Sequence, residues 1–334
     1  MSHRFSTAAC FAVLALAASA AEANADPIVM KISLPTINEN VHEVAKSLAA
    51  RVEKDSGGRI KPEIYPASQL GSIPRQIEGT QFGSIQCAII PPEFFSGIDQ
   101  RFEVMAAPGL VDSMDNARKT AADPAVLKLM LGLGADKGLH GAGMFVALPS
   151  YAIAKTPIRH LADFKGKKLR VLASDFQTAA FQRIGVTPVA MTLGDVLPAI
   201  QQGAIDGAIS GMPVFTSMHY QDAAKYVTTT GQPYIFIIIE YSAKWVQSLP
   251  ADLQKVVDAA AAAEGENGAA LGQKYLDSAR HDWVAAGAEL IDLPKDEEAS
   301  MMQQFAAAAQ EVAGKRPDVA AAYKIVTDAA KRDK

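Results

Sequence analysis

The sequence predicts an α/β protein with a mostly parallel sheet, divided between two lobes. Strand patterns alternate with helix patterns, the alternation starts again after about residue 150, and one helical pattern covers residues 249–290. Strands that alternate with helices form βαβ units, whose strands lie parallel. A chain of 334 residues is also longer than one core usually supports, which favours two lobes.

The first 25 residues are typical of a secretory signal peptide. Arg4 precedes an apolar run over 8–21 that is too short to cross a bilayer, and Ala23-Asn24-Ala25 forms a small-x-small cleavage site. We therefore expect cleavage near Ala25 and export, with an uncleaved anchor as the alternative. After cleavage Cys87 would be the only cysteine, which excludes an intramolecular disulfide in the mature chain.

The first set of elements lies between residues 27 and 90. Residues 27–35 alternate as a strand, and a helix is expected to start where Asn40 and Glu43 form a capping box and to stop at Gly57-Gly58. A second strand over 59–66, a short helix over 72–84 and a buried strand over 85–90 complete this set.

The second set follows the same order. The expected elements are strands over 167–172, 186–191, 204–210 and 234–241, and helices over 174–185 and 192–203, the latter containing Pro198. The pattern over 249–290, with Gly265 and Gly268 near its middle, is too long to cover one lobe at 1.5 Å per residue. We expect it to run across both lobes, followed by Ala-rich helix from Lys295.

Composition and motifs argue against several functions. The net charge of −4 disfavours binding to nucleic acid or to an anionic membrane surface. Ser210 lacks the preceding glycine of a nucleophile elbow, and residues 131–138 lack the spacing of a dinucleotide loop. The six histidines show no metal-ligand spacing. We expect no enzyme, no cofactor and no metal.

One arginine stands out at the end of a strand. In the stretch "GKKLRVLAS" (166–174), Arg170 lies on one strand face just before Ser174 begins a helix. A charged side chain is usually solvated at the surface. A guanidinium also offers a planar fork of donors that matches the two oxygens of a carboxylate. The residues alone leave both interpretations open.

Four segments together resemble the DctP-like solute-binding proteins of tripartite ATP-independent periplasmic (TRAP) transporters. They are "YPASQLGSIPRQIEGTQFGSIQCAI" (65–89), "DFKGKKLRV" (163–171), "GVTPVAMTLGDVLPAIQQGAIDGAIS" (185–210) and "LPADLQKVVDAAAAA" (249–263). The resemblance covers almost the whole mature chain in the same order.

The resemblance implies a type II periplasmic-binding-protein fold: two α/β lobes, a ligand cleft between them and a long helix spanning both. It implies lobe I over 26–149 plus about 236–275, and lobe II over 150–235 plus about 276–334. It also implies a periplasmic protein that binds a small organic acid, with Arg170 holding the carboxylate, and that works with TRAP integral-membrane permease subunits.

The sequence departs from the family pattern around the expected cleft. Ser150 stands where the sialic-acid-binding branch has a second arginine, and "DGAISGMPVF" (206–215) replaces a Glu-Asn-Pro tripeptide. The candidate binding residues are Arg170, Met191, Ser150, Tyr151, Pro91, Pro92, Ser210, Met212 and Phe215, with Phe94, Phe95 and Gln177 beside them.

One clear arginine in apolar surroundings favours a monocarboxylate with an apolar or aromatic body. The alternatives are a C4-dicarboxylate, a sugar acid, or a periplasmic ligand sensor of the same fold. The three phenylalanines could instead pack the lobe cores.

Overall fold

One mixed sheet runs through the computed structural model, which describes residues 26–172 and 174–332. Within these residues the sheet has nine strands in the order β2-β1-β3-β8-β4-β7-β5-β6, and β9 pairs with β8. The strands are β1 (Ile28–Ser33), β2 (Ile60–Tyr65), β3 (Cys87–Ile90), β4 (Leu139–Ala154), β5 (Lys168–Val171), β6 (Thr187–Ala190), β7 (Gly207–Ser210), β8 (Tyr226–Ser242) and β9 (Glu289–Asp292).

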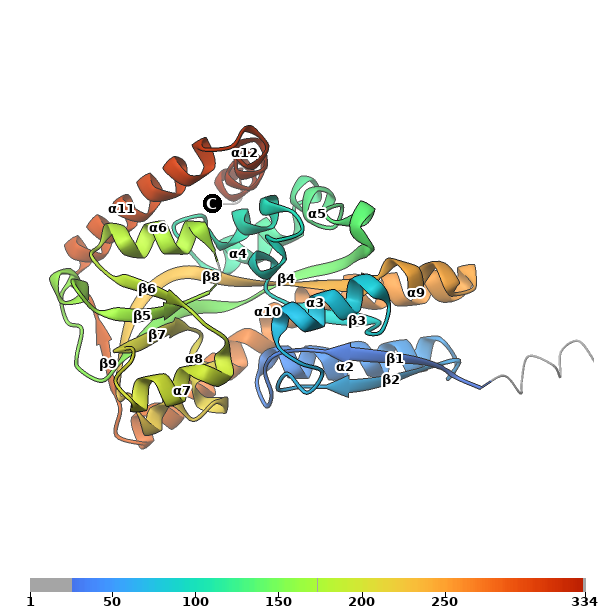
Figure 1. Cartoon of the computed structure of the whole chain (residues 1–334), viewed down its shortest axis with the longest axis horizontal. Coiled ribbons are helices and arrows are strands. Elements are labelled where there is room, and N and C mark those ends of the chain that lie inside the picture. Colours follow the sequence, from blue (N-terminus) through green and yellow to red (C-terminus); the bar gives the residue numbers. More distant parts are fainter. Residues whose placement is uncertain (1–25, 173, 333–334) are drawn as a thin grey trace, which may run out of the picture.

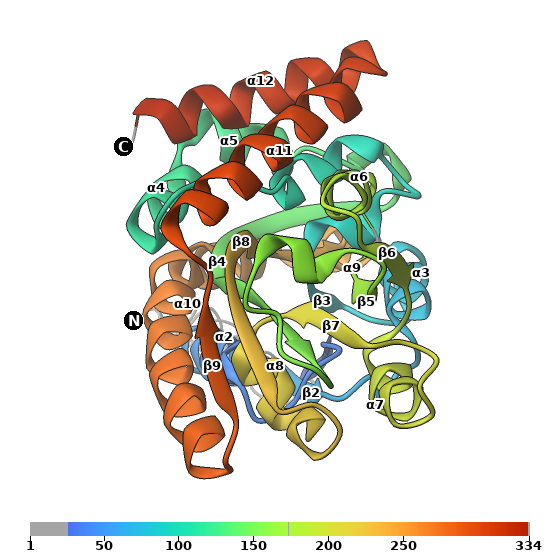
Figure 2. The same cartoon turned by 90° about the vertical axis from the view of Figure 1, so that its left-hand side faces the viewer.

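Helices cover both faces of this sheet (Figures 1 and 2). They are α2 (Asn40–Asp55), α3 (Ile73–Phe82), α4 (Met114–Ala122), α5 (Pro124–Met130), α6 (Asp175–Arg183), α7 (Leu193–Gln201), α8 (Met212–Ser217), α9 (Ala243–Ser248), α10 (Ala251–Ala285), α11 (Lys295–Gly314) and α12 (Pro317–Arg332).

Two long antiparallel strands join two groups of parallel strands. β1, β2 and β3 pair in parallel, and so do β5, β6 and β7. Between these groups β4 pairs with β8 along most of their length, from Leu139↔Ser242 to Ala154↔Tyr226 (Figure 1). The expected parallel pairing therefore holds inside each group, and the junction is antiparallel. The strand expected over 234–241 is part of the longer β8, and β4 was missed.

Each group of strands has apolar cores on its two faces. Around β1–β3, one core packs against α2 and α10 and the other against α3, α4 and α12. Around β5–β7, one core includes α6 and α11, and the other includes α7, α8 and α10. The chain thus forms two α/β lobes on one continuous sheet.

For the limits of the lobes we propose the ranges expected from the sequence, with one change. Helix α12 packs against α4 and α5, which belong to the expected lobe I (Figure 2). Its buried side chains, such as Val319 and Val326, belong to the same core as Phe102 and Val126. We therefore propose that residues 317–332 belong to lobe I.

Helix α10 spans both lobes, as expected. Its 35 residues extend over about 52 Å at 1.5 Å per residue, and it packs against α2 and β4 and, further along, against α8. The helix continues through Gly265 and Gly268. At Gly272 its backbone approaches β4 so closely that an added Cβ would lie 1.8 Å from the carbonyl oxygen of Ala147. Glycine is therefore required at this position.

Replacing Gly272 with alanine should destabilise the protein, although alanine normally favours a helix. The added methyl group would collide with backbone, and overpacking of this kind costs about 1–3 kcal/mol. Gly265→Ala is the matched control in the same helix, because its Cβ would lie 3.5 Å from the carbonyl oxygen of Met144.

We expect Gly265→Ala to be neutral or to stabilise by about 0.5–1 kcal/mol, the usual difference between the two residues in a helix. Urea unfolding measures both free energies. Equal effects of the two substitutions would contradict the close packing of α10 on β4.

Candidate functional site

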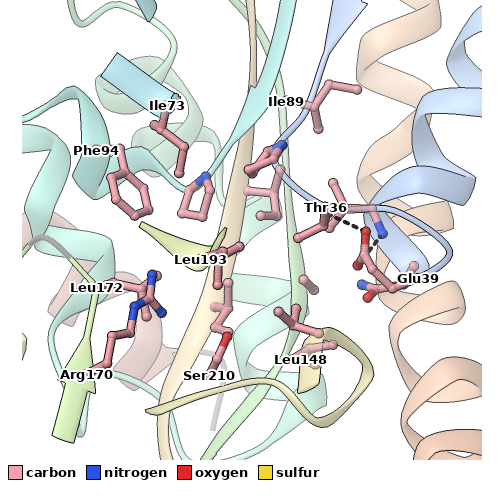
Figure 3. A pocket seen from close by; sticks show the side chains of 18 residues that line it. Thr36, Glu39, Ile73, Ile89, Phe94, Leu148, Arg170, Leu172, Leu193 and Ser210 are labelled. Atoms are coloured by element: carbon pink, nitrogen blue, oxygen red, sulfur yellow. Dashed lines mark hydrogen bonds between the residues drawn. The ribbon is translucent and has the colours of Figure 1, made fainter. Parts of the chain in front are cut away.

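A pocket lies where the carboxyl ends of several strands meet the start of α2. It encloses about 540 Å³ of space that protein atoms do not fill, part of it open to solvent. Figure 3 shows Arg170 on one side, Thr36 and Glu39 on the opposite side, and apolar side chains between them. The lining residues are Pro35, Thr36, Glu39, Asn40, Val41, Ile73, Ile89, Pro91, Phe94, Ala147, Leu148, Arg170, Leu172, Leu193, Ser210, Val214, Ile235 and Ile237.

Arg170 is a buried cation that has no acidic partner among the described residues. It is 1% exposed, which rules out a solvated surface arginine. Its Nε donates to the carbonyl oxygen of Met191 at 3.1 Å, and its Nη1 donates to that of Ile209 at 3.4 Å. These bonds fix the side chain but use only part of the five-donor fork.

Burial has a clear electrostatic consequence for Arg170. It lowers the pKa of this guanidinium to about 10, although Tyr220 and Glu93 act in the opposite direction. Removing a charged group from water costs several kcal/mol unless an opposite charge and hydrogen bonds compensate. Within the described chain Arg170 donates hydrogen bonds only to backbone carbonyls and forms no ion pair, so the compensation by Tyr220 and Glu93 is incomplete and the site favours an anion.

One buried carboxyl group, Glu93, lies near this arginine, and a second, Glu103, lies near Glu93. Glu93 belongs to a short 3₁₀ segment, Pro92–Phe95, and burial raises the pKa of this carboxyl to about 7, helped by Glu103 and opposed by Arg170. Burial also raises the pKa of Glu103, whose Oε2 accepts a hydrogen bond from the backbone N–H of Asp175 at 2.7 Å. Ser174 begins α6 as expected, with its hydroxyl accepting from Gln177 N at 3.4 Å. The start of α6 is therefore already engaged by protein groups.

The opposite side of the pocket is formed by the start of α2. The carboxylate of Glu39 accepts from Thr36 Oγ1 at 2.6 Å, from Val41 N at 2.9 Å and from His42 N at 3.0 Å. Glu39 is thus the cap of this helix, and the predicted capping box of Asn40 with Glu43 is wrong.

Asn40 is the first residue of the helix rather than its cap. Its side chain is 0% exposed, and neither Nδ2 nor Oδ1 has a hydrogen-bond partner within the described chain. A buried amide without hydrogen-bond partners lowers the stability of the folded protein. Two such atoms next to a pocket therefore point to a bound group that supplies the hydrogen bonds.

Three of the nine candidate residues from the sequence line this pocket: Arg170, Ser210 and Pro91, together with the neighbouring Phe94. Met191 contributes the carbonyl oxygen that accepts from Arg170. Pro92 is buried in the 3₁₀ segment.

The other candidates lie outside the lining. Tyr151, Met212 and Phe215 belong to a core cluster with Tyr220 and Trp283. Ser150 is buried, and its Oγ has no partner among the described residues. Beside the candidates, Phe95 packs in a core, and Gln177 Oε1 accepts from Leu172 N at 3.3 Å.

Several lining residues, chiefly Glu39 and Asn40, were not predicted from the sequence. The signal available for them was weak, because polar residues at a helix start are usually caps. Within residues 26–172 and 174–332, no group of three or more His, Cys, Asp or Glu side chains could hold a metal ion.

A pocket between two lobes that are joined by paired strands is the arrangement of a hinged solute-binding protein. The model of bacterial extracellular solute-binding protein family 7 (DctP) matches residues 34–315. The chain therefore belongs to this family and is a TRAP periplasmic solute-binding protein, a transport component rather than an enzyme.

Relatives agree with this assignment. The C4-dicarboxylate-binding periplasmic protein DctP of Vibrio cholerae is 28% identical over 72% of this chain and 74% of its own. A TRAP periplasmic solute-binding protein from Desulfovibrio salexigens with bound orotic acid is 22% identical, with a TM-score of 0.85 over 92% of this chain and 99% of its own. The sugar acid binding protein DctPAm from Advenella mimigardefordensis, in complex with galactonate, is 20% identical, with a TM-score of 0.84 over 93% of this chain and 100% of its own. The type II fold is thus confirmed.

The proposed signal peptide, residues 1–25, lies outside the described residues. In the described part of the chain, no helix combines the length and the apolar character needed to cross a membrane. The family relatives are periplasmic, in agreement with the location expected from the sequence.

Glu93 should make stability depend on pH. Its pKa is raised in the folded state, from 4.5 to about 7, so its contribution is fully present below pH 4.5 and is lost as the pH rises through 7. The difference corresponds to about 3 kcal/mol at 1.36 kcal/mol per unit.

Glu93→Gln imitates the protonated acid and should remove this dependence. We expect the free energy of unfolding of the wild type, relative to Glu93→Gln, to fall between pH 4.5 and pH 8. Urea unfolding of both proteins at several pH values measures the difference. A constant difference over this range would mean that Glu93 does not titrate there.

Proposed function

We propose that this protein captures a small organic acid by pairing its carboxylate with Arg170 and delivers it to TRAP membrane permease subunits. The observation that supports this most is the buried guanidinium, which faces the pocket with only backbone carbonyls as partners (Figure 3). A bidentate carboxylate would supply the missing negative charge, and such a pair is stronger in a cleft that excludes water.

The lining favours a monocarboxylate with an apolar or aromatic body. Between Arg170 and the start of α2, the space is bordered by aliphatic and aromatic groups such as Ile73, Phe94, Leu148 and Leu172. Among the described lining residues, Arg170 is the only basic one. A C4-dicarboxylate would need a second cation, which the described lining lacks, and a sugar acid would need polar partners for many hydroxyl groups, whereas most of the lining is apolar.

The binding cycle follows from the hinge. In the open form Arg170 is accessible, an acid binds, and the lobes close over it by bending where β4 and β8 cross between them. The register irregularities in this pair, between Val146 and Leu148 and between Pro149 and Tyr151, lie in this region. A ligand sensor of the same fold would share the binding step and differ only in its membrane partner.

Replacing Arg170 should abolish tight acid binding. Arg170→Ala removes the charge, and Arg170→Met removes it while filling a similar volume. Loss of one partner of a buried charge pair costs about 2–5 kcal/mol, which lowers the affinity by roughly 30-fold to several thousand-fold. Arg183→Ala is the matched control, because this arginine lies on the surface of α6, paired with Glu311.

Binding is screened by thermal shift of refolded, ligand-stripped protein with aromatic monocarboxylates, keto and hydroxy acids, C4-dicarboxylates and sugar acids. A ligand at 100 times its Kd stabilises by about 2.7 kcal/mol, which gives a clear shift. Wild-type affinity in folded Arg170→Met would refute the pairing. A response to dicarboxylates alone would refute the preference for monocarboxylates.

A further inference from the structure

The wall opposite Arg170 combines two polar features that the proposed carboxylate pairing does not use. Asn40 is fully buried at the pocket, with a free amide donor and a free amide acceptor among the described residues. Glu39 lies beside it in the chain and faces Arg170 across the apolar part of the pocket (Figure 3). A ligand held at Arg170 therefore meets a neutral amide and an acidic group at its far end.

Asn40 is suited to a neutral polar group. Its Nδ2 can donate to a carbonyl or hydroxyl oxygen, and its Oδ1 can accept from a hydroxyl or an amide N–H. In the folded protein these two atoms have lost water and gained nothing within the described chain, so a ligand group that bonds to them recovers this cost.

Glu39 is suited to excluding a second carboxylate. Its carboxylate is the acceptor in three hydrogen bonds, which Thr36 Oγ1, Val41 N and His42 N donate. It lies at the start of the 16-residue helix α2. Burial raises the pKa of Glu39 above its usual value, and these donors and the positive end of the helix act in the opposite direction. The described side chains that line the pocket include no cation on this side. A second carboxylate here would be buried beside an acidic side chain without a counter-charge, and these three donors are already used by Glu39.

We propose that Asn40 and Glu39 select the far end of the ligand, so that the site takes a monocarboxylate bearing a hydroxyl, carbonyl or amide group there and rejects diacids. This inference rests on the proposed function, because it assumes that Arg170 holds the carboxylate. It adds the chemical class of the rest of the ligand.

Two matched series of acids test it: benzoate, 4-hydroxybenzoate and terephthalate, and hexanoate, 6-hydroxyhexanoate and adipate. Within each series only the far end changes, from apolar to hydroxyl to carboxylate. Titration calorimetry on ligand-stripped wild type should give the hydroxy acid an affinity about ten-fold above its apolar parent in at least one series, the value of one net hydrogen bond. The diacid should be the weakest of its series.

Two variants separate the two roles. In Asn40→Leu the affinity of the hydroxy acid relative to its apolar parent should fall to about one-fold. In Glu39→Gln the diacid should gain several-fold relative to the hydroxy acid. Because Glu39 caps α2, circular dichroism checks the fold of this variant, and Asn40→Leu tests the inference independently of the cap.

The outcomes are distinct from those of the proposed function. An unchanged hydroxyl preference in Asn40→Leu, or a diacid as the tightest ligand of the wild type, overturns this inference even where binding still depends on Arg170. If none of the six acids binds the wild type, the inference also fails, and the comparison of Arg170→Met with wild type on the wider panel judges the proposed function separately.

Discussion

The architecture of the site depends on one unbalanced charge. Arg170 is buried at the end of β5 and is held by two backbone carbonyls, without an acidic partner in the described chain. Proteins rarely bury a cation in this way, since the desolvation cost exceeds what carbonyl dipoles return. The folded chain tolerates this cost at a place where an anion from solution can offset it. In the proposed function, stability given up at the pocket becomes binding energy for an acid.

The rest of the fold brings a second wall to this charge. The shared strands β4 and β8 and the long helix α10 connect the lobes, and the start of α2 lies across the pocket from β5. Close backbone contact between α10 and β4 at Gly272 fixes the helix on the strands. Apolar side chains border the intervening space, so the charged and polar groups lie at its two ends. This arrangement suits a small acid better than a polymer or a membrane surface.

Much of this fold was predictable from local patterns. Apolar periodicity predicted the strand in "PIVMKISLP" and the helix over residues 41–52. It also predicted the strands and helices between Lys167 and Ser210. Strand β4 was not predictable in this way. It is buried along nearly all of its length, so apolar and polar residues do not alternate in it. At the site, the strand pattern singled out Arg170 but left a surface role open, and the family resemblance implied that it holds a carboxylate. Asn40 was taken for a cap because only the three-dimensional structure shows that Glu39 caps the helix and leaves the amide unpaired. Phe215 and Met212 follow a pocket strand but turn into the core, and sequence spacing does not distinguish these directions.

The most direct test of the central claim is a crystal structure of the protein with the tightest-binding acid of the thermal-shift panel. The account predicts that the ligand carboxylate lies within hydrogen-bond distance, about 2.7–2.9 Å, of the Arg170 guanidinium, with the body of the ligand along the apolar wall. A carboxylate bound elsewhere, with Arg170 still facing only the carbonyls of Met191 and Ile209, would contradict it.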